Sequence, residues 1–212
     1  MRLSVSLLFI IFITFKFFSN LGAQVGVIEL EEAVRENYGA LPIAIESSSS
    51  SILSYSQQVF GLHGGYRVVT NNESVFSFGL EPSGTNSVKL SIFQGLGNKA
   101  VYTSTLKGDD LQHAVCLACD RAVEYTSNDV GFFAGKLSFV VKKHLKSEIY
   151  ISDLLFTKVR AVTSDRSFVM GPNWSPDGTQ LLYTTYHKSG FPDIYLMDLA
   201  AGVRQAIANF KG

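Results

Sequence analysis

The chain has no excess of either charge and only two cysteines. Lysine plus arginine and aspartate plus glutamate number 18 each in 212 residues, and no block of like charges occurs. Without an overall field, a role in binding nucleic acid or an acidic membrane surface has little support. The length allows one or two domains with real cores.

The two cysteines, Cys116 and Cys119, lie in a stretch that is predicted to be helical. Their spacing resembles a redox pair, but a position in the middle of a helix lacks the N-terminal dipole that lowers a thiol pKa. A zinc site would need two further ligands, and only His113 is near. We therefore expect two small buried residues on a helix face.

Motifs of catalysis are also missing. The chain has no Gly-x-Ser-x-Gly elbow, no phosphate-binding loop and no His-Glu-x-x-His. None of the four histidines is predicted to have a carboxylate at ligand spacing on a common face; they are His63, His113, His144 and His187. No catalytic, cofactor-binding or metal-binding residue is assigned, and no enzyme activity is expected.

Residues 1–23 have the composition of a signal peptide. Arg2 precedes an uninterrupted apolar run that ends at Phe15, which is too short to span a bilayer comfortably. Small residues at Gly22 and Ala23 offer a cleavage site, so the mature chain is expected to begin near Gln24. The alternative is an uncleaved membrane anchor.

Residues 24–130 are predicted to form a small α+β domain. Ser50 or Ser51, in a run of five serines, can cap a helix over residues 52–60, although a flexible spacer is the other interpretation of that run. Asp109 or Asp110 is expected to cap a second helix that ends near residue 125, with an apolar stripe that packs on a sheet. The predicted strands cover residues 41–45, 66–70, 74–80, 87–93 and 100–106.

Residues 131–212 contain a stretch that the chain nearly repeats. Leu137-Ser-Phe-Val140 returns as Leu181-Leu-Tyr-Thr184, and Glu148-Ile-Tyr-Ile-Ser-Asp-Leu154 returns as Asp193-Ile-Tyr-Leu-Met-Asp-Leu199. A repeat of this length, dense in short strands, is typical of the blades of a β-propeller. The recurring acids Asp153 and Asp198 are expected to cap turns at strand ends.

An aromatic turn motif lies between the two copies. It consists of Trp174, Ser175, Pro176, Asp177 and Gly178. Proline presets φ at the second position of the turn, aspartate bonds the local backbone, and glycine accepts the geometry that follows. Trp174 is expected to wedge between neighbouring blades. The five residues are interpreted as blade architecture without chemistry of their own.

Together these features resemble the TolB family, the periplasmic propeller proteins of the Tol-Pal system of Gram-negative bacteria. The resemblance rests on the signal peptide, the α+β domain, the junction Gly131-Phe-Phe-Ala-Gly135 and the blades with Trp-Ser-Pro-Asp-Gly. It implies a periplasmic scaffold, not an enzyme, which supports outer-membrane integrity, cell division and colicin-type protein import.

The resemblance also implies partners. In the family the mature N-terminus adds to TolA as an extended strand, whereas Pal and colicin peptides dock on the propeller; outer-membrane proteins are further expected partners. The stretch that matches the TolA-binding strand is Gln24, Val25, Gly26, Val27, Ile28 and Glu29. Its apolar alternation suits addition to a sheet edge, and packing on its own domain is an equal alternative.

Two other functions are carried as alternatives. The chain could be the N-terminal part of a serine peptidase that contains a propeller, or an orphan cell-surface propeller that binds glycans or peptides.

The residues after Gly135 amount to less than two blades, whereas closed propellers have about four to eight. The expected fold is therefore an α+β domain followed by the first, incomplete blades of a propeller. A truncated product is one hypothesis for this length, and assembly from several chains is the other.

Overall fold

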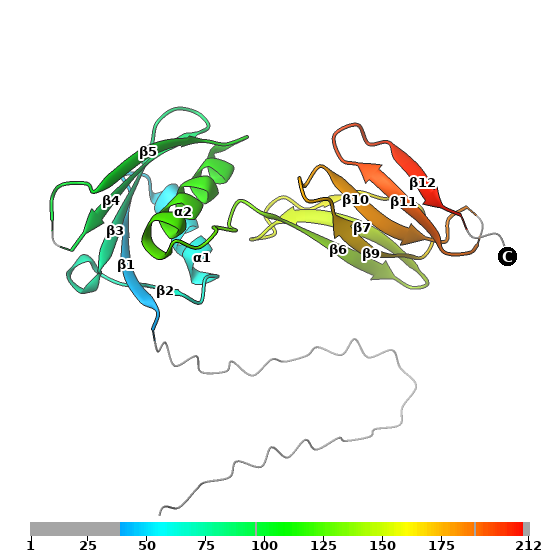
Figure 1. Ribbon diagram of the computed structural model, residues 1–212, viewed down its shortest axis with the longest axis horizontal. Helices are drawn as coiled ribbons and strands as arrows, with labels where there is room; N and C mark the ends of the chain where they lie inside the picture. The colour runs from blue at the N-terminus through cyan, green and yellow to red at the C-terminus, as the bar shows by residue number, and fades with distance from the viewer. Residues whose placement is uncertain (1–38, 96, 189, 210–212) are drawn as a thin grey trace, which may run out of the picture. The chain divides into compact units, whose positions relative to one another are not determined.

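The computed structural model describes residues 39–95, 97–188 and 190–209. Its N-terminal part is a five-stranded sheet of order β2-β1-β3-β4-β5 that carries two helices (Figure 1). Strand β1 pairs in parallel with β2 and β3, and the remaining pairs are antiparallel. In chain order the elements are β1 (Leu41–Glu46), α1 (Ser50–Gly61), β2 (Tyr66–Val68), a 3-10 turn (Asn71–Glu73), β3 (Phe76–Pro82), β4 (Ser87–Gln94), β5 (Tyr102–Lys107) and α2 (Leu111–Ser127).

Side-chain caps determine where the two helices begin. Asp110 caps α2 by accepting a hydrogen bond from the amide of His113 at 3.0 Å, as predicted. Helix α1 is capped by Ser49, not by Ser50 or Ser51 as predicted, and Ser49 Oγ lies 3.5 Å from the amide nitrogen of Ile52. Any serine of the run can accept such a bond, so the local sequence does not distinguish between them.

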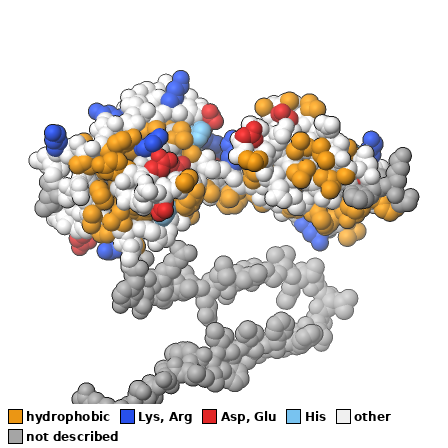
Figure 2. All heavy atoms as spheres, viewed as in Figure 1, with side chains coloured by type: hydrophobic (Ala, Val, Ile, Leu, Met, Phe, Trp, Pro, Cys, Tyr) orange, Lys and Arg blue, Asp and Glu red, His pale blue; other side chains and the backbone are white. Residues whose placement is uncertain are grey.

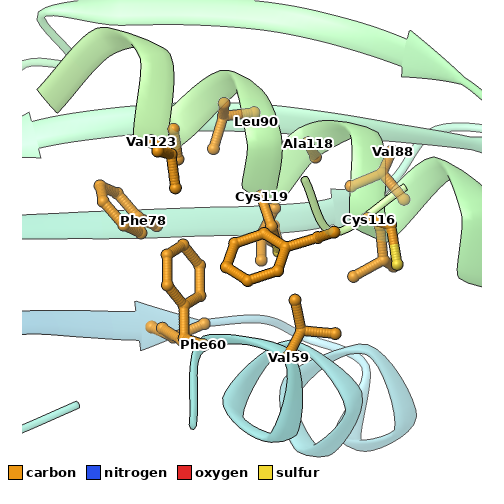
Figure 3. Close-up of a cluster of buried hydrophobic side chains, with 14 of the residues drawn as sticks. Val59, Phe60, Phe78, Val88, Leu90, Cys116, Ala118, Cys119 and Val123 are labelled. Atoms are coloured by element: carbon orange, nitrogen blue, oxygen red, sulfur yellow. The ribbon is translucent and has the colours of Figure 1, made fainter. Parts of the chain in front are cut away.

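The core of this domain lies between the sheet and the two helices. Alternate residues of each strand point to the helical side, where Phe78, Leu80 and Leu90 are fully buried. Figure 3 shows Val59 and Phe60 of α1 meeting Cys119 and Val123 of α2 within this cluster. Both cysteines are free and buried, which confirms that they are core residues.

The C-terminal part consists of two antiparallel sheets that follow the sequence repeat. The first has the order β6-β7-β8 and the second β12-β11-β10-β9. Their strands are β6 (Lys136–Lys143), β7 (Lys146–Asp153), β8 (Arg160–Ala161), β9 (Val169–Trp174), β10 (Gln180–Thr185), β11 (Asp193–Asp198) and β12 (Arg204–Ala208). The repeated residues place β6, β7 and β8 in correspondence with β10, β11 and β12.

The two sheets share one hydrophobic cluster. Ile149 and Ile151 of β7 meet Val169, Leu181 and residues of β11 in a core that is separate from that of the α+β domain. These two sheets are the blade pair. The described strands do not close into a ring, so the fold is an α+β domain followed by incomplete propeller blades, as predicted.

Three predictions are not tested by the described residues. The predicted signal peptide, residues 1–23, and the strand-addition segment, residues 24–29, are outside the described residues. The domain limit at residues 130 and 131 falls in the connection between α2 and β6 and stays a prediction. No helix among the described residues is long and apolar enough to cross a membrane.

Candidate interaction surface

The predicted turn motif closes the hairpin between β9 and β10. The amide of Gly178 donates to the carbonyl of Ser175 at 2.9 Å, and Gly178 has a φ of 69°. The Asp177 carboxylate accepts bonds from Ser175 Oγ at 2.6 Å and from the amide of Thr179 at 3.1 Å. These hydrogen bonds lower the pKa of Asp177, and the bond from the Ser175 hydroxyl has the largest effect. These polar groups of the motif therefore form hydrogen bonds within the turn itself.

Trp174 stands at the end of β9, next to the turn. It is half-buried and packs against the cluster that the two sheets of the blade pair share. Its register partner in β10 is Leu181, which is fully buried. The aromatic residue of the motif therefore contributes apolar contact to the blade core.

The two recurring acids cap turns at equivalent strand ends, as predicted. Asp153 accepts bonds from the amides of Thr157 at 2.7 Å and Lys158 at 3.2 Å. Asp198 accepts bonds from the amides of Ala200 at 2.9 Å and Ala201 at 2.8 Å. Burial alone would raise the pKa of Asp153, but its hydrogen bonds lower it overall.

A buried polar network joins the segment before β9 to the second sheet, and the sequence analysis missed it. The Asp165 side chain is only 3% exposed, accepts a bond from Thr185 Oγ1 at 2.7 Å and forms an ion pair with Arg204. Arg204 also donates to the hydroxyl of Tyr183 at 3.3 Å. Burial lowers the pKa of Arg204, but its bonds to Tyr183 and Asp165 raise it overall.

The same segment is tied to the first sheet. The Glu148 carboxylate accepts bonds from Thr163 Oγ1 at 2.6 Å and from the amides of Asp165 at 3.0 Å and Arg166 at 2.7 Å. The connection between the sheets is therefore held at both sides by carboxylates. The only signal in the sequence was that Glu148 and Arg204 occupy repeated positions, which says nothing of their partners.

The outer faces of the blade pair are apolar and partly exposed. On the first sheet Phe139 stacks on Tyr150 with ring centroids 6.0 Å apart and contacts Phe156, which is 54% exposed. On the second sheet Met170 and Leu182 are each 39% exposed. Figure 2 shows hydrophobic side chains gathered over this part of the chain. Exposed apolar side chains that gather on a surface are typical of sites that bind other protein surfaces.

A cavity of about 280 Å³ lies where the connection between α2 and β6 and the turn after β7 meet α1 and α2. In its wall the Tyr55 hydroxyl lies 3.7 Å from Cys116 Sγ, and Asp110 forms an ion pair with Lys158. Other lining residues are His113, Phe133, Lys136, Ile151 and Arg160. Burial raises the pKa of both the Tyr55 hydroxyl and the Cys116 thiol, so neither is activated as a nucleophile.

One expectation about the histidines was wrong. His113 Nδ1 lies 3.3 Å from a carboxylate oxygen of Asp109, four residues earlier. The capped first turn of α2 brings the two together, which a face-by-face comparison of helix positions did not reveal. No group of three His, Cys, Asp or Glu side chains that could hold a metal ion occurs among residues 39–95, 97–188 and 190–209.

An α+β domain followed by a three-stranded and a four-stranded antiparallel sheet in tandem, built on a sequence repeat, is typical of the β-propeller class. Residues 123–212 match the family described as the TolB beta propeller domain. In sequence the chain is 33% identical over 100 residues to the Tol-Pal system protein TolB of Chromobacterium violaceum, and 38% identical over 82 residues to that of Azoarcus sp.. These matches cover 47% and 39% of this chain, and 22% and 19% of the relatives.

A solved structure extends the likeness to the α+β domain. The crystal structure of TolB from Acinetobacter baumannii superposes with a TM-score of 0.71 at 17% identity, over 82% of this chain and 50% of that one. At this identity the superposition shows a shared fold. The chain spans about half the length of this solved structure, and the sequence matches cover about a fifth of the curated TolB proteins.

Proposed function

We propose that the chain is a protein interaction scaffold of the Tol-Pal type that acts in the periplasm. The observation that carries the proposal is the match of the blade pair to the propeller domain of TolB. Its roles would be support of outer-membrane integrity and cell division, together with colicin-type import. Its expected partners are TolA, Pal and outer-membrane proteins.

The chemistry of the described residues is consistent with binding. The polar groups of the turn motif and of the Asp165–Arg204 network bond one another, whereas apolar side chains of the outer sheet faces stay exposed. Such surfaces gain free energy by covering apolar area, at about 25 cal/mol per Å² of area buried. A partner of the blades would therefore be recognised through aromatic and aliphatic contacts.

The contact with TolA would be made by residues 24–29 through strand addition. An extended segment that joins a sheet edge gains main-chain hydrogen bonds and places alternate side chains in pockets. Val25 and Val27 are the alternate apolar residues of this segment. The proposal therefore predicts that the backbone of this stretch matters as much as its side chains.

The test is a pull-down with the TolA domain of the same bacterium. Deletion of residues 24–30 is expected to abolish capture, and Val25→Pro with Val27→Pro is expected to do the same, because proline removes the amide donors. Val25→Thr with Val27→Thr is the matched control, since threonine keeps a high strand propensity. Absence of capture by the unmodified chain, or equal capture by the proline variant, would overturn the proposal.

A further inference from the structure

Strand β5 is an edge of the five-stranded sheet that is left without the usual protection. Among residues 39–95, 97–188 and 190–209 it pairs only with β4, and α2 packs on one of its faces (Figure 1). The strand carries no proline, and its only charge is Lys107 at the end. Its register with β4 has no shift from Tyr102 to Lys107, although just before it the amide of Val101 also donates to the carbonyl of Ile92, at 2.8 Å. Sheet edges in native proteins are normally blunted by charges, prolines, bulges or very short strands.

The opposite edge of the same sheet shows that protection. Strand β2 is three residues long and carries Arg67 at its centre, exposed to solvent. A short, charged edge offers little to a further strand. The two edges of one sheet therefore differ, and the open one is β5.

The hydrogen-bond pattern identifies which groups of β5 are free to pair. The amide of Gly108 donates to the carbonyl of Asn86 at 2.9 Å, which sets the phase of the ladder between β4 and β5. Because hydrogen-bonded pairs alternate along an antiparallel ladder, Tyr102, Ser104 and Leu106 face β4 with their main-chain groups. The main-chain groups of Thr103 and Thr105 are then directed to the open edge.

The side chains of β5 are self-complementary about Ser104. If two copies of the strand run antiparallel with Ser104 at the twofold axis, Thr103 of each copy faces Thr105 of the other and the two exchange main-chain bonds. Tyr102 then faces Leu106 on the side of the helices. Thr–Thr and aromatic–aliphatic cross-strand pairs are favourable, each by roughly 0.2–1 kcal/mol. Lys107 falls opposite Val101, so this register places no like charges together.

The apolar rim beside the edge fits the same arrangement. The Tyr102 ring lies against Tyr125 of α2 with centroids 5.0 Å apart, and Tyr125 is 43% exposed. Val101, just before the strand, is 46% exposed. A second copy that extends the sheet would cover part of this surface, because its own helix lies on the same side.

We propose that β5 is a self-association site, at which two copies of the chain join their five-stranded sheets through antiparallel β5–β5 pairing centred on Ser104. A closed twofold contact of this kind is isologous, so it stops at a dimer. It uses the α+β domain alone and leaves the blade pair accessible. The proposal is independent of the Tol-Pal function.

Matched charge variants of the full-length chain test the pairing by sedimentation velocity over a hundredfold range of concentration. Thr103→Lys with Thr105→Lys places like charges opposite each other twice, and the association constant should fall at least tenfold. Thr103→Lys with Thr105→Glu places opposite charges together, and should dimerise at least as well as the unmodified chain. A monomeric unmodified chain, or equal behaviour of the two variants, would overturn the proposal.

A cross-linking experiment tests the register itself. In a non-hydrogen-bonded antiparallel pair the Cβ atoms approach closely enough for a disulfide, so Ser104→Cys should give a covalent dimer with oxidised glutathione. Lys107→Cys is the control on the same strand, where the two introduced thiols would lie far apart. Equal dimer yield from both variants would show non-specific contact, and no dimer from Ser104→Cys would overturn the proposed register. Thermal unfolding of each variant checks that it is folded.

Discussion

The α+β domain and the blade pair bury their sheets in different ways. The five-stranded sheet is covered on one face by α1 and α2, and 19 buried residues form its core. The two sheets of the blade pair pack on each other and share a core of 7 buried residues, while their outer faces keep exposed apolar side chains. The first part completes a core from its own elements, whereas each blade depends on its neighbours.

The difference reflects how repeat architectures gain stability. A blade is a single sheet with two faces, so it reaches full burial only between two other blades. In the α+β domain the helices replace such neighbours. The blade pair compensates in part with polar ties, namely the bonds of Glu148 and the buried pair of Asp165 with Arg204. This comparison predicts that the two parts respond differently to substitution.

The largest effect is expected from Phe60→Ala in the α+β core. Phe60 is 1% exposed and contacts the rings of Tyr66, Phe78 and Phe133 at centroid distances of 5.2–5.5 Å. Removing such a ring costs roughly 3–5 kcal/mol of unfolding free energy. Urea unfolding followed by far-UV circular dichroism measures the loss.

The chain has a single tryptophan, Trp174, whose fluorescence reports on the blade pair. If the two parts have separate cores, Phe60→Ala shifts the fluorescence midpoint much less than the dichroism midpoint. Leu62→Ala, at a side chain that is 48% exposed, is the control and should change either midpoint little. Equal shifts of both probes would mean that the two parts unfold as one unit.

The next effect is expected from Asp165→Ala in the blade pair. The substitution leaves Arg204 without its ion-pair partner in a site where the carboxylate side chain is 3% exposed. Breaking a buried pair costs up to 3–5 kcal/mol, and because Arg204 is 30% exposed we expect about 2–3 kcal/mol. Here Trp174 fluorescence should show the loss first. If Asp165→Ala with Arg204→Met recovers most of the stability, the cost is that of the unpaired charge.

A smaller effect is expected from Gly178→Ala in the turn motif. Gly178 has a φ of 69°, where a Cβ is strained, so the substitution should cost about 1 kcal/mol. Gly61→Ala is the matched control in the α+β domain, since Gly61 ends α1 without a positive φ and has open space around it. That change should be neutral or slightly stabilising. A stability loss at Gly61 as large as that at Gly178 would contradict the backbone explanation.

The smallest effect concerns the contribution of Asp110 to the unfolding free energy and its loss at acid pH. The hydrogen bond from Lys158, followed by that from the amide of His113, lowers the pKa of this carboxyl in the folded chain. A lowered pKa contributes stability above the unfolded value of 3.8, and this contribution is lost as the pH falls through the folded pKa. Because the Asp110 side chain is 46% exposed, solvent screening limits the contribution to roughly a few tenths of a kcal/mol.

Asp110→Asn tests this contribution, because asparagine still caps a helix. The difference in unfolding free energy between Asp110→Asn and the unmodified chain should be present at pH 7 and be lost as the pH falls below 3.8 and through the folded pKa. A series of urea titrations from pH 7 into the acid range measures it. A difference that does not depend on pH would instead point to the cap.

Local patterns made much of the fold predictable. The repeat located the blades, because β6, β7, β10 and β11 each carry two or more of the repeated residues. An aspartate at position 109 or 110 followed by an apolar stripe predicted α2 correctly, and Asp110 is the cap. The cap of α1 was misplaced by one residue, since adjacent serines are chemically equivalent and each can accept the capping hydrogen bond.

The candidate interaction surface was less predictable. Asp165 and Arg204 are 39 residues apart and became partners only because the two sheets fold against the same segment. The open edge of β5 depends on the order of five strands, which includes parallel pairing that no short motif records. In both cases the decisive contact joins residues that local periodicity cannot relate.

By itself, the sequence determined the types of elements, the blade repeat, the turn at residues 175–178 and the resemblance to TolB. These follow from preferences that act over a few residues, such as capping, alternation and the φ of glycine. Tertiary structure alone decided which faces are covered, which carboxylates hold the blades together and which sheet edge stays open. Those properties arise from contacts between distant segments, whose free energy exists only once the chain has folded.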